Sequence, residues 1–249
     1  LHVNGSNWNW KIFGLSVHST NIKGLTSFNI ELDKFNQINA ITSNIDLKND
    51  DYPNPEFLGA SGKIDYRKGI LSIQDSLIIN LGLGKLQAFG GINLEQNKTD
   101  LNFVIKNTDL GFVSTLAGLK ESPKGLAYGT IKFSGFLDNP SVKGNLTFNK
   151  ISYGEINLSS FKSSFIINSI QETRHGSLSA ETGNSMFGDI NIDDSSLNLY
   201  FMGDTILIAN ASASSDKQYI RLSGKILGFN TIQIDQIQPT LNDQFISNL

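Results

Sequence analysis

The sequence predicts an all-β, elongated and repetitive chain, and three observations carry this prediction. Apolar and polar residues alternate with period two along most of the 249 residues. Glycine, asparagine and aspartate interrupt the alternation at short intervals, and only one stretch shows helical spacing. Because successive side chains of a strand point to opposite faces, the pattern predicts a sheet with one apolar and one polar face.

The alternating segments define the residues that we expect on the apolar face. In the clearest run, Leu101, Phe103 and Ile105 are expected to point one way, and Asn102 and Lys106 the other. The apolar residues are mostly β-branched or aromatic, and such residues fit a pleated surface. The full set expected to line this face is Leu101, Phe103, Ile105, Ile131, Phe133, Leu146, Phe148, Phe161, Phe165, Ile190, Ile192, Leu197, Leu199 and Phe201.

Short glycine- and asparagine-containing segments are expected to mark the turns between strands. The predicted turns include Lys68-Gly69, Gly90-Gly91, Tyr153-Gly154 and Gly183-Asn184. Glycines that precede alternating runs, at Gly62, Gly129, Gly144 and Gly188, are also interpreted as turn residues that open a strand.

One short helix is predicted near residues 109–119. Phe112, Leu116 and Leu119 recur at helical spacing, Thr108 or Asp109 is a candidate N-cap, and Ser122-Pro123 ends the segment. A helix of about three turns is too short to be stable alone in water, so it is expected to pack against the sheet.

The chain is expected to form one elongated β domain over residues 1–249. Residues 168–176 are the candidate connection between two sub-segments, 1–168 and 176–249. The first residue is not Met, no signal peptide precedes the strands and no stretch approaches the roughly 20 apolar residues of a membrane span. We therefore expect a segment of a longer protein, with any membrane anchor outside it.

Composition and motifs argue against several functions. The net charge is −3 and no basic run occurs, so nucleic acid is not an expected partner. There is no cysteine, and the three histidines lie far apart, without metal-ligand spacing. Adjacent carboxylates at Asp50-Asp51 and Asp193-Asp194 would point to opposite faces of a strand, so neither pair predicts an acid–base couple. We expect no enzyme activity, no cofactor and no metal.

A turn signature in the middle of the chain carries a family resemblance. Residues 107–133 contain the predicted helix and a strand, and residues 134–148 then read Ser-Gly-Phe-Leu-Asp-Asn-Pro-Ser-Val-Lys-Gly-Asn-Leu-Thr-Phe. Its structural residues are Gly135, Asn139, Pro140 and Gly144: the glycines relieve crowding, and Asn139-Pro140 forces a turn. This stretch resembles the TamB/AsmA-like family of bacterial envelope proteins (translocation and assembly module).

The resemblance implies a fold, a function and a location. It implies a U-shaped sheet, a β-taco or open β-solenoid-like arrangement, with an apolar concave face. It implies a periplasmic bridge, anchored in the inner membrane, that shields phospholipid acyl chains between the inner and outer membranes or supports outer-membrane protein assembly. The implied partners are phospholipid acyl chains and an outer-membrane barrel protein. The implied signature is structural, and it assigns no catalytic residue.

Two other interpretations remain open from the residues themselves. A structural or adhesive β-solenoid with a filled core and no ligand would show the same alternation, because it also has one apolar face. A carbohydrate-active β-helix enzyme would need clustered carboxylates and aromatic residues on a solvent face, and no such cluster is evident in the sequence.

Overall fold

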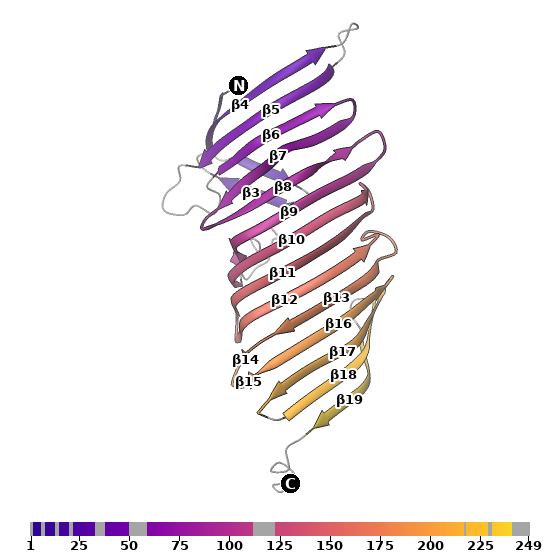
Figure 1. The fold of residues 1–249 in the computed structure, drawn as a ribbon. Coiled ribbons are helices and arrows are strands. Elements are labelled where there is room, and N and C mark those ends of the chain that lie inside the picture. Colours follow the sequence, from indigo (N-terminus) through magenta and orange to yellow (C-terminus); the bar gives the residue numbers. More distant parts are fainter. Residues whose placement is uncertain are drawn as a thin grey trace. The chain divides into compact units, whose positions relative to one another are not determined.

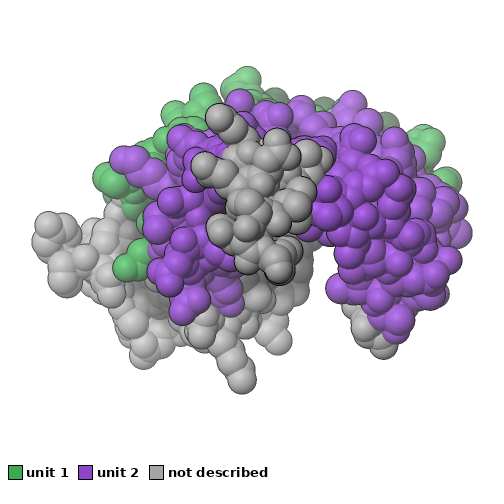
Figure 2. All heavy atoms as spheres, turned by 90° about the horizontal axis from the view of Figure 1, so that it is seen from below, with its two compact units in different colours: residues 1–137 green, residues 138–249 purple. Residues whose placement is uncertain are grey.

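The computed structural model describes almost only β-strands (Figure 1). The described residues are 2–5, 8–12, 15–19, 22–32, 38–49, 59–111, 123–216, 218–228 and 231–240, and the side chains of residues 2–28, 31–39, 47, 49 and 240 are left out of this description. The chain divides into two compact units, unit 1 (residues 1–137) and unit 2 (residues 138–249), coloured separately in Figure 2.

Unit 1 is an open antiparallel sheet of sequence neighbours. β4 pairs with β1 on one side and with β5 on the other, and β5 to β10 then pair in chain order. A separate two-stranded sheet pairs β2 with β3. The strands are β1 (His2–Gly5), β2 (Trp8–Ile12), β3 (Leu15–Ser19), β4 (Ile22–Leu32), β5 (Ile38–Asn49), β6 (Gly59–Arg67), β7 (Ile70–Leu81), β8 (Gly84–Asn93), β9 (Lys98–Asp109) and β10 (Lys124–Phe136).

Unit 2 repeats this design. β11, β12, β13, β16, β17, β18 and β19 pair antiparallel in that order, and the β14–β15 hairpin continues the sheet beside the start of β12. Figure 2 shows unit 2 bent into an arch. The strands are β11 (Pro140–Tyr153), β12 (Ile156–Asn168), β13 (His175–Thr182), β14 (Ser185–Phe187), β15 (Ile190–Ile192), β16 (Asp194–Met202), β17 (Thr205–Ser215), β18 (Gln218–Leu227) and β19 (Thr231–Thr240).

The predicted fold class, an all-β open sheet, is confirmed. The predicted helix at 109–119 falls mostly on residues 112–122, which lie outside the described residues. At its start, the backbone N–H of Gly111 donates a hydrogen bond to Asp109 Oδ1 (2.6 Å), the bond that an N-cap accepts.

Several predicted turns are turns in the structure, and the others are corrected. Lys68-Gly69 lies in a turn. Tyr153 ends β11, and Gly154 lies in the turn that follows. Gly183-Asn184 forms a bend. Gly90-Gly91 instead lies inside β8, where a Cβ on Gly90 would collide with the carbonyl oxygen of Asp100 on β9. Glycine there serves a close approach of backbones rather than a turn.

The glycines interpreted as strand openers also differ from the prediction. Gly62, Gly129 and Gly144 lie inside β6, β10 and β11, and only Gly188 lies in a turn. Register shifts occur beside Gly62 and Gly129, between Ser61 and Lys63 and between Ala127 and Gly129. A bulge inserts an extra residue without ending the strand, so a glycine at a bulge resembles a turn glycine in the sequence.

The candidate connection at 168–176 is a hairpin loop of unit 2. β12 and β13 pair on either side of it, from Phe161 opposite Thr182 to Asn168 opposite His175. The expectation of one elongated domain over residues 1–249 stays a prediction.

Candidate functional site

The strand register of unit 2 assembles rows of mainly apolar residues across seven strands. Opposed residues of an antiparallel pair share a face, so the pairings can be followed from strand to strand. Two neighbouring rows run from β11 to β19. One is Leu146, Ser163, Ala180, Leu197, Ala211, Leu222 and Ile237, and the other is Gly144, Phe165, Leu178, Leu199, Ile208, Gly224 and Ile234.

Two outer rows widen the same face. One contains Phe201 and Ile206, and the other contains Phe148 and Phe161, whose ring centroids lie 5.7 Å apart. We call these four rows the apolar face of unit 2. In full, the outer rows are Val142, Ile167, Gly176, Phe201, Ile206, Ile226 and Ile232, and Phe148, Phe161, Thr182, Ser195, Ala213, Ile220 and Pro239.

Unit 1 has a corresponding apolar face. Phe133 lies opposite Leu101, and Ile131 lies opposite Phe103. The rings of Phe103 and Phe133 meet edge to face, with centroids 5.8 Å apart and an interplanar angle of 87°. The pairings extend this face over β8, β7 and β6 through Leu86, Ala88, Ile92, Leu71, Ile73, Leu77, Ile79, Ala60, Ile64 and Tyr66.

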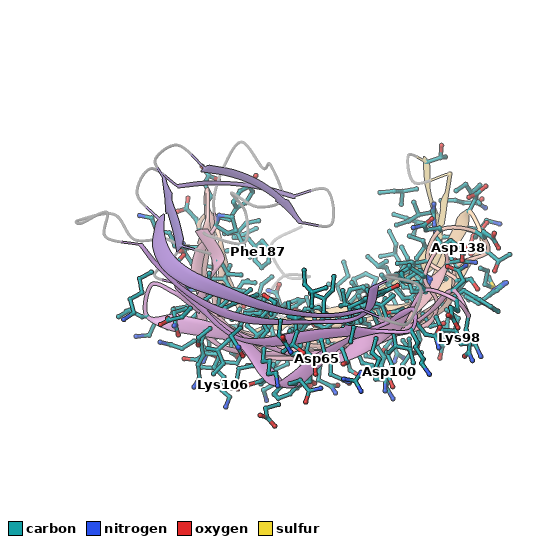
Figure 3. The ribbon with its side chains drawn as sticks, turned by 90° about the horizontal axis from the view of Figure 1, so that it is seen from above. Asp65, Lys98, Asp100, Lys106, Asp138 and Phe187 are labelled. Atoms are coloured by element: carbon teal, nitrogen blue, oxygen red, sulfur yellow. The ribbon has the colours of Figure 1, made fainter. Side chains whose placement is uncertain are left out.

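The opposite face of unit 1 carries the charges. Asp65, Lys98, Asp100 and Lys106 point away from the inside of the curved sheet (Figure 3). On this face Lys132 Nζ lies 2.6 Å from Asp100 Oδ1, between residues that the alternation assigns to the polar side. The apolar face of unit 1 is therefore the concave one.

In unit 2 no second layer covers the apolar face among the described residues, where the strands contact one another mainly as hydrogen-bonded neighbours. In unit 1 the separate β2–β3 hairpin, indigo in Figure 3, lies on the concave side of the main sheet. Most side chains of the apolar faces are only half-buried, and towards the last strand of unit 2 they are exposed: Ile232 by 67%, Ile234 by 50% and Ile237 by 53%. Soluble domains normally bury the apolar face of a sheet against another layer.

Most of the predicted lining residues are brought onto these faces. Leu101, Phe103, Ile105, Ile131 and Phe133 share the face of unit 1. Leu146, Phe148, Phe161, Phe165, Leu197, Leu199 and Phe201 share the face of unit 2. That these faces line a lipid groove remains a prediction.

Ile190 and Ile192 lie apart from the rows. They belong to β15 at the end of the β14–β15 hairpin, where Ile190 is 63% exposed. Ile192 instead borders a hollow of about 660 Å³ in unit 2, together with Ile151, Leu158 and Met186. The bend at Gly183-Asn184 separates this hairpin from the face, and a period of two does not reveal such a bend.

Sequence reasoning missed other members of the faces. Leu178 and Ala180 on β13, and Ile206 and Ile208 on β17, alternate as regularly as the residues that were selected. Their signal was present in the sequence. In β7 the signal was weaker, because the register shift between Ile73 and Leu77 interrupts the period.

The turn signature holds two loops of unit 2 together. Asn139 Nδ2 donates to Glu172 Oε2 (2.9 Å), and Asn139 Oδ1 accepts from the backbone N–H of Gln171 (3.2 Å). Pro140 is buried, begins β11 and accepts a bond at its carbonyl from Ile170 N–H (3.2 Å). Gly135 is in β10 with φ of 100°, and Gly144 lies opposite Phe165.

The described residues show no metal centre and no membrane-spanning helix. No group of three or more His, Cys, Asp or Glu residues among them could hold a metal ion. None of their helices has the length and apolarity that crossing a membrane requires.

The apolar faces are thus the features with the clearest functional potential, and they offer a wide hydrophobic contact surface without catalytic groups of their own. No family model matches the chain, and neither the curated proteins nor the solved structures include a match to it.

Proposed function

We propose that the apolar faces shield the acyl chains of phospholipids. The observation that carries this proposal is the broad apolar face that strand pairing assembles in each unit. Among the described residues, no second layer covers the face of unit 2. Apolar surface left in water is costly, by about 25 cal/mol per Å². A bound acyl chain would remove both the face and itself from water.

The dimensions of the face suit this ligand. Strands lie about 4.8 Å apart, so a row across the seven paired strands of unit 2 extends about 29 Å along the curve of the sheet. One leaflet of a bilayer has a hydrocarbon depth of about 15 Å, half of the roughly 30 Å core. A single acyl chain therefore fits within the face of one unit.

The energetics also suit this ligand. Burial of each methylene contributes about 0.8 kcal/mol. For a chain of about 16 carbons outside a membrane, apolar contacts must therefore supply roughly 12 kcal/mol of stabilising free energy. Contacts of this kind are non-directional, and positions along a row of Leu, Ile and Phe are nearly equivalent. A chain could move along the face without a deep minimum, and no nucleophile, base or metal is needed.

The wider proposal follows from the resemblance in residues 107–148. In that role the chain is a segment of a TamB/AsmA-like bridge protein in the periplasm, and it moves phospholipid between membranes or supports outer-membrane protein assembly with a barrel partner. The lipid-shielding role is the part that the described geometry supports directly.

The filled solenoid is the second candidate function, and the strand pairing does not favour it. A β-helix stacks its coils as parallel strands, whereas every described pairing here is antiparallel between strands of an open sheet. An adhesive role without a ligand would leave apolar side chains of these faces exposed to water.

Site-specific photo-crosslinking tests the proposal. Photoreactive residues at Phe103, Ile131 and Leu199 on the apolar faces should capture phospholipid in cells that express the chain. Matched probes at Asn102, Lys132 and Asn198, one residue away on the opposite faces, should not. Equal labelling of the two sets, or no labelling of either, would contradict the proposal.

A further inference from the structure

A second hollow lies in unit 2 and is lined mainly by residues of the polar face, while Thr182, Ser195 and Ala213 of one outer apolar row also border it. Its volume is about 390 Å³, at the small end of the range of roughly 300–1,000 Å³ typical of ligand pockets. One side is a row of opposed residues on four neighbouring strands, Lys162, Glu181, Ser196 and Ser212.

The other side of the hollow is a parallel row one step further along the strands. Asp194 lies opposite Ser214, and Ser214 lies opposite Tyr219. Ser160 and Gly183 extend this row towards β12, and a Cβ on Gly183 would meet Ser160 Oγ only at ordinary contact distance (3.5 Å), so space remains there. We call these two rows the hydroxyl hollow.

One pair of hydroxyl groups links two strands of the hollow, because Ser196 Oγ and Ser212 Oγ lie 2.8 Å apart. Either oxygen of this pair can be the donor, so the row can present a donor or an acceptor to a ligand.

The charges of the lining disfavour an anion as the natural ligand. Lys162 is the one cation in the lining and it lies 3.6 Å from Glu181, while Asp194 adds a second carboxylate. The lining therefore has a formal charge of −1, and it repels phosphate or sulfate. A neutral ligand with many hydroxyl groups matches it, because each hydroxyl both donates to carboxylates and accepts from an ammonium group.

An aromatic ring completes the arrangement. Tyr219 is 39% exposed at the end of the second row, with an apolar ring body and a polar tip. Such a ring can cover the apolar C–H face of a sugar while the flanking polar groups bind the sugar hydroxyls.

We propose that the hydroxyl hollow of unit 2 binds a neutral saccharide, with Tyr219 against a sugar ring and Glu181 and Asp194 accepting hydrogen bonds from its hydroxyl groups. The three residues given these roles belong to rows on the face away from the acyl-binding rows. Loss of sugar binding and loss of lipid binding are therefore distinguishable.

Titration of the purified chain with defined sugars tests the proposal. Maltose and N,N′-diacetylchitobiose serve as probes at millimolar concentrations, with inorganic phosphate as the anion control and saturation-transfer NMR as the measurement. At least one disaccharide should bind and phosphate should not. Tyr219→Ala should weaken binding about tenfold or more, the effect of about 1.4 kcal/mol of lost contact.

Tyr200→Ala is the matched control. Tyr200 is a tyrosine on the same face that is 49% exposed and lies outside the hollow, so its loss should leave sugar binding unchanged. Glu181→Gln is a second variant. The Glu181 side chain is 65% exposed, so its replacement should leave folding intact. Loss of the carboxylate acceptor should weaken sugar binding several-fold. The proposal is overturned if neither disaccharide binds, if phosphate competes with the sugar, or if Tyr219→Ala and Glu181→Gln both bind as the parent chain does.

Discussion

The inner strands of unit 1 and the last strand of unit 2 follow the same alternation, yet their apolar side chains are buried to very different extents. In unit 1, Leu101 on β9 is 7% exposed and Ala88 on β8 is 4% exposed. In unit 2, Ile232, Ile234 and Ile237 on β19 are at least half exposed. β9 has hydrogen-bonded strands on both sides, whereas β19 has only β18 as a neighbour among the described residues.

This difference separates two effects that a sequence pattern merges. The period of two decides the face to which a residue belongs, and the neighbouring strands decide how much of that residue leaves the water. The four predictions below test this separation, and they run from the largest expected effect to the smallest.

A charge within the apolar face of unit 1 should have the largest effect, and the effect should be a loss of lipid binding rather than a loss of folding. Phe133→Arg places a guanidinium beside Phe103 and Leu101. Its long stem lets the charge lift towards water, so the sheet should survive, while acyl chains would meet a charge that is costly to desolvate. Phospholipid recovered with the purified chain should fall several-fold by mass spectrometry.

Phe136→Arg on the same strand is the control for that variant. Phe136 lies opposite Lys98, on the charged face, and is 58% exposed, so the new charge should leave lipid loading unchanged. A folded Phe133→Arg chain with normal lipid loading would mean that this face of unit 1 does not hold the acyl chain.

Truncations should show the effect of neighbouring strands on stability. Leu101→Ala removes a buried side chain and should destabilise unit 1 by about 2–5 kcal/mol. Ile234→Ala removes an exposed one and should cost no more than about 1 kcal/mol. Denaturant unfolding of both variants measures the difference, and equal losses would refute the comparison.

A pair of glycine substitutions in unit 2 should separate tight from loose backbone packing. A Cβ on Gly176 would collide with the carbonyl oxygen of Ile166, whereas one on Gly183 meets only side-chain oxygens at ordinary distances. Gly176→Ala should therefore cost about 1–3 kcal/mol of stability, an overpacking effect. Gly183→Ala should be nearly neutral in the same thermal melt. A neutral Gly176→Ala would show that β12 and β13 can move apart.

The aromatic pairs should show the smallest difference. Phe103–Phe133 meets edge to face at 87°, and Phe148–Phe161 is tilted at 51°, with centroid distances of 5.8 and 5.7 Å. Double-mutant cycles to leucine should give coupling energies of about 0.5–1.5 kcal/mol, with the larger value for the edge-to-face pair in unit 1. The reverse order would show that burial, rather than ring geometry, governs the coupling.

Much of the sheet could be predicted from the sequence because its information is local. Alternation placed Leu101, Phe133, Leu199 and Phe201 on the correct apolar faces, since a residue's face depends only on its position in its own strand and on the register. Turns such as Lys68-Gly69 were visible for the same reason.

The remaining features depend on contacts that no short window contains. Gly90 was interpreted as a turn residue because its packing partner, Asp100 on β9, lies on another strand. Ile190 was placed on the face because the bend at Gly183-Asn184 is not evident from alternation. The hydroxyl hollow brings together residues from β12, β13, β16, β17 and β18, and a row of serines in separate strands carries no signal of its own.

The neighbour-only pairing of the strands also has a consequence for how the chain unfolds. Each strand in the main sheets makes most of its contacts with strands that are next to it in sequence or separated from it by one hairpin. Each main sheet therefore behaves as a one-dimensional array rather than as a closed core. Stability in such an array is approximately a sum of nearest-neighbour terms, and unfolding need not be all-or-none. Amide hydrogen exchange in unit 2 should then be fastest in β19 and slow down strand by strand towards β13, a graded protection that a two-layer sandwich of the same size would not show.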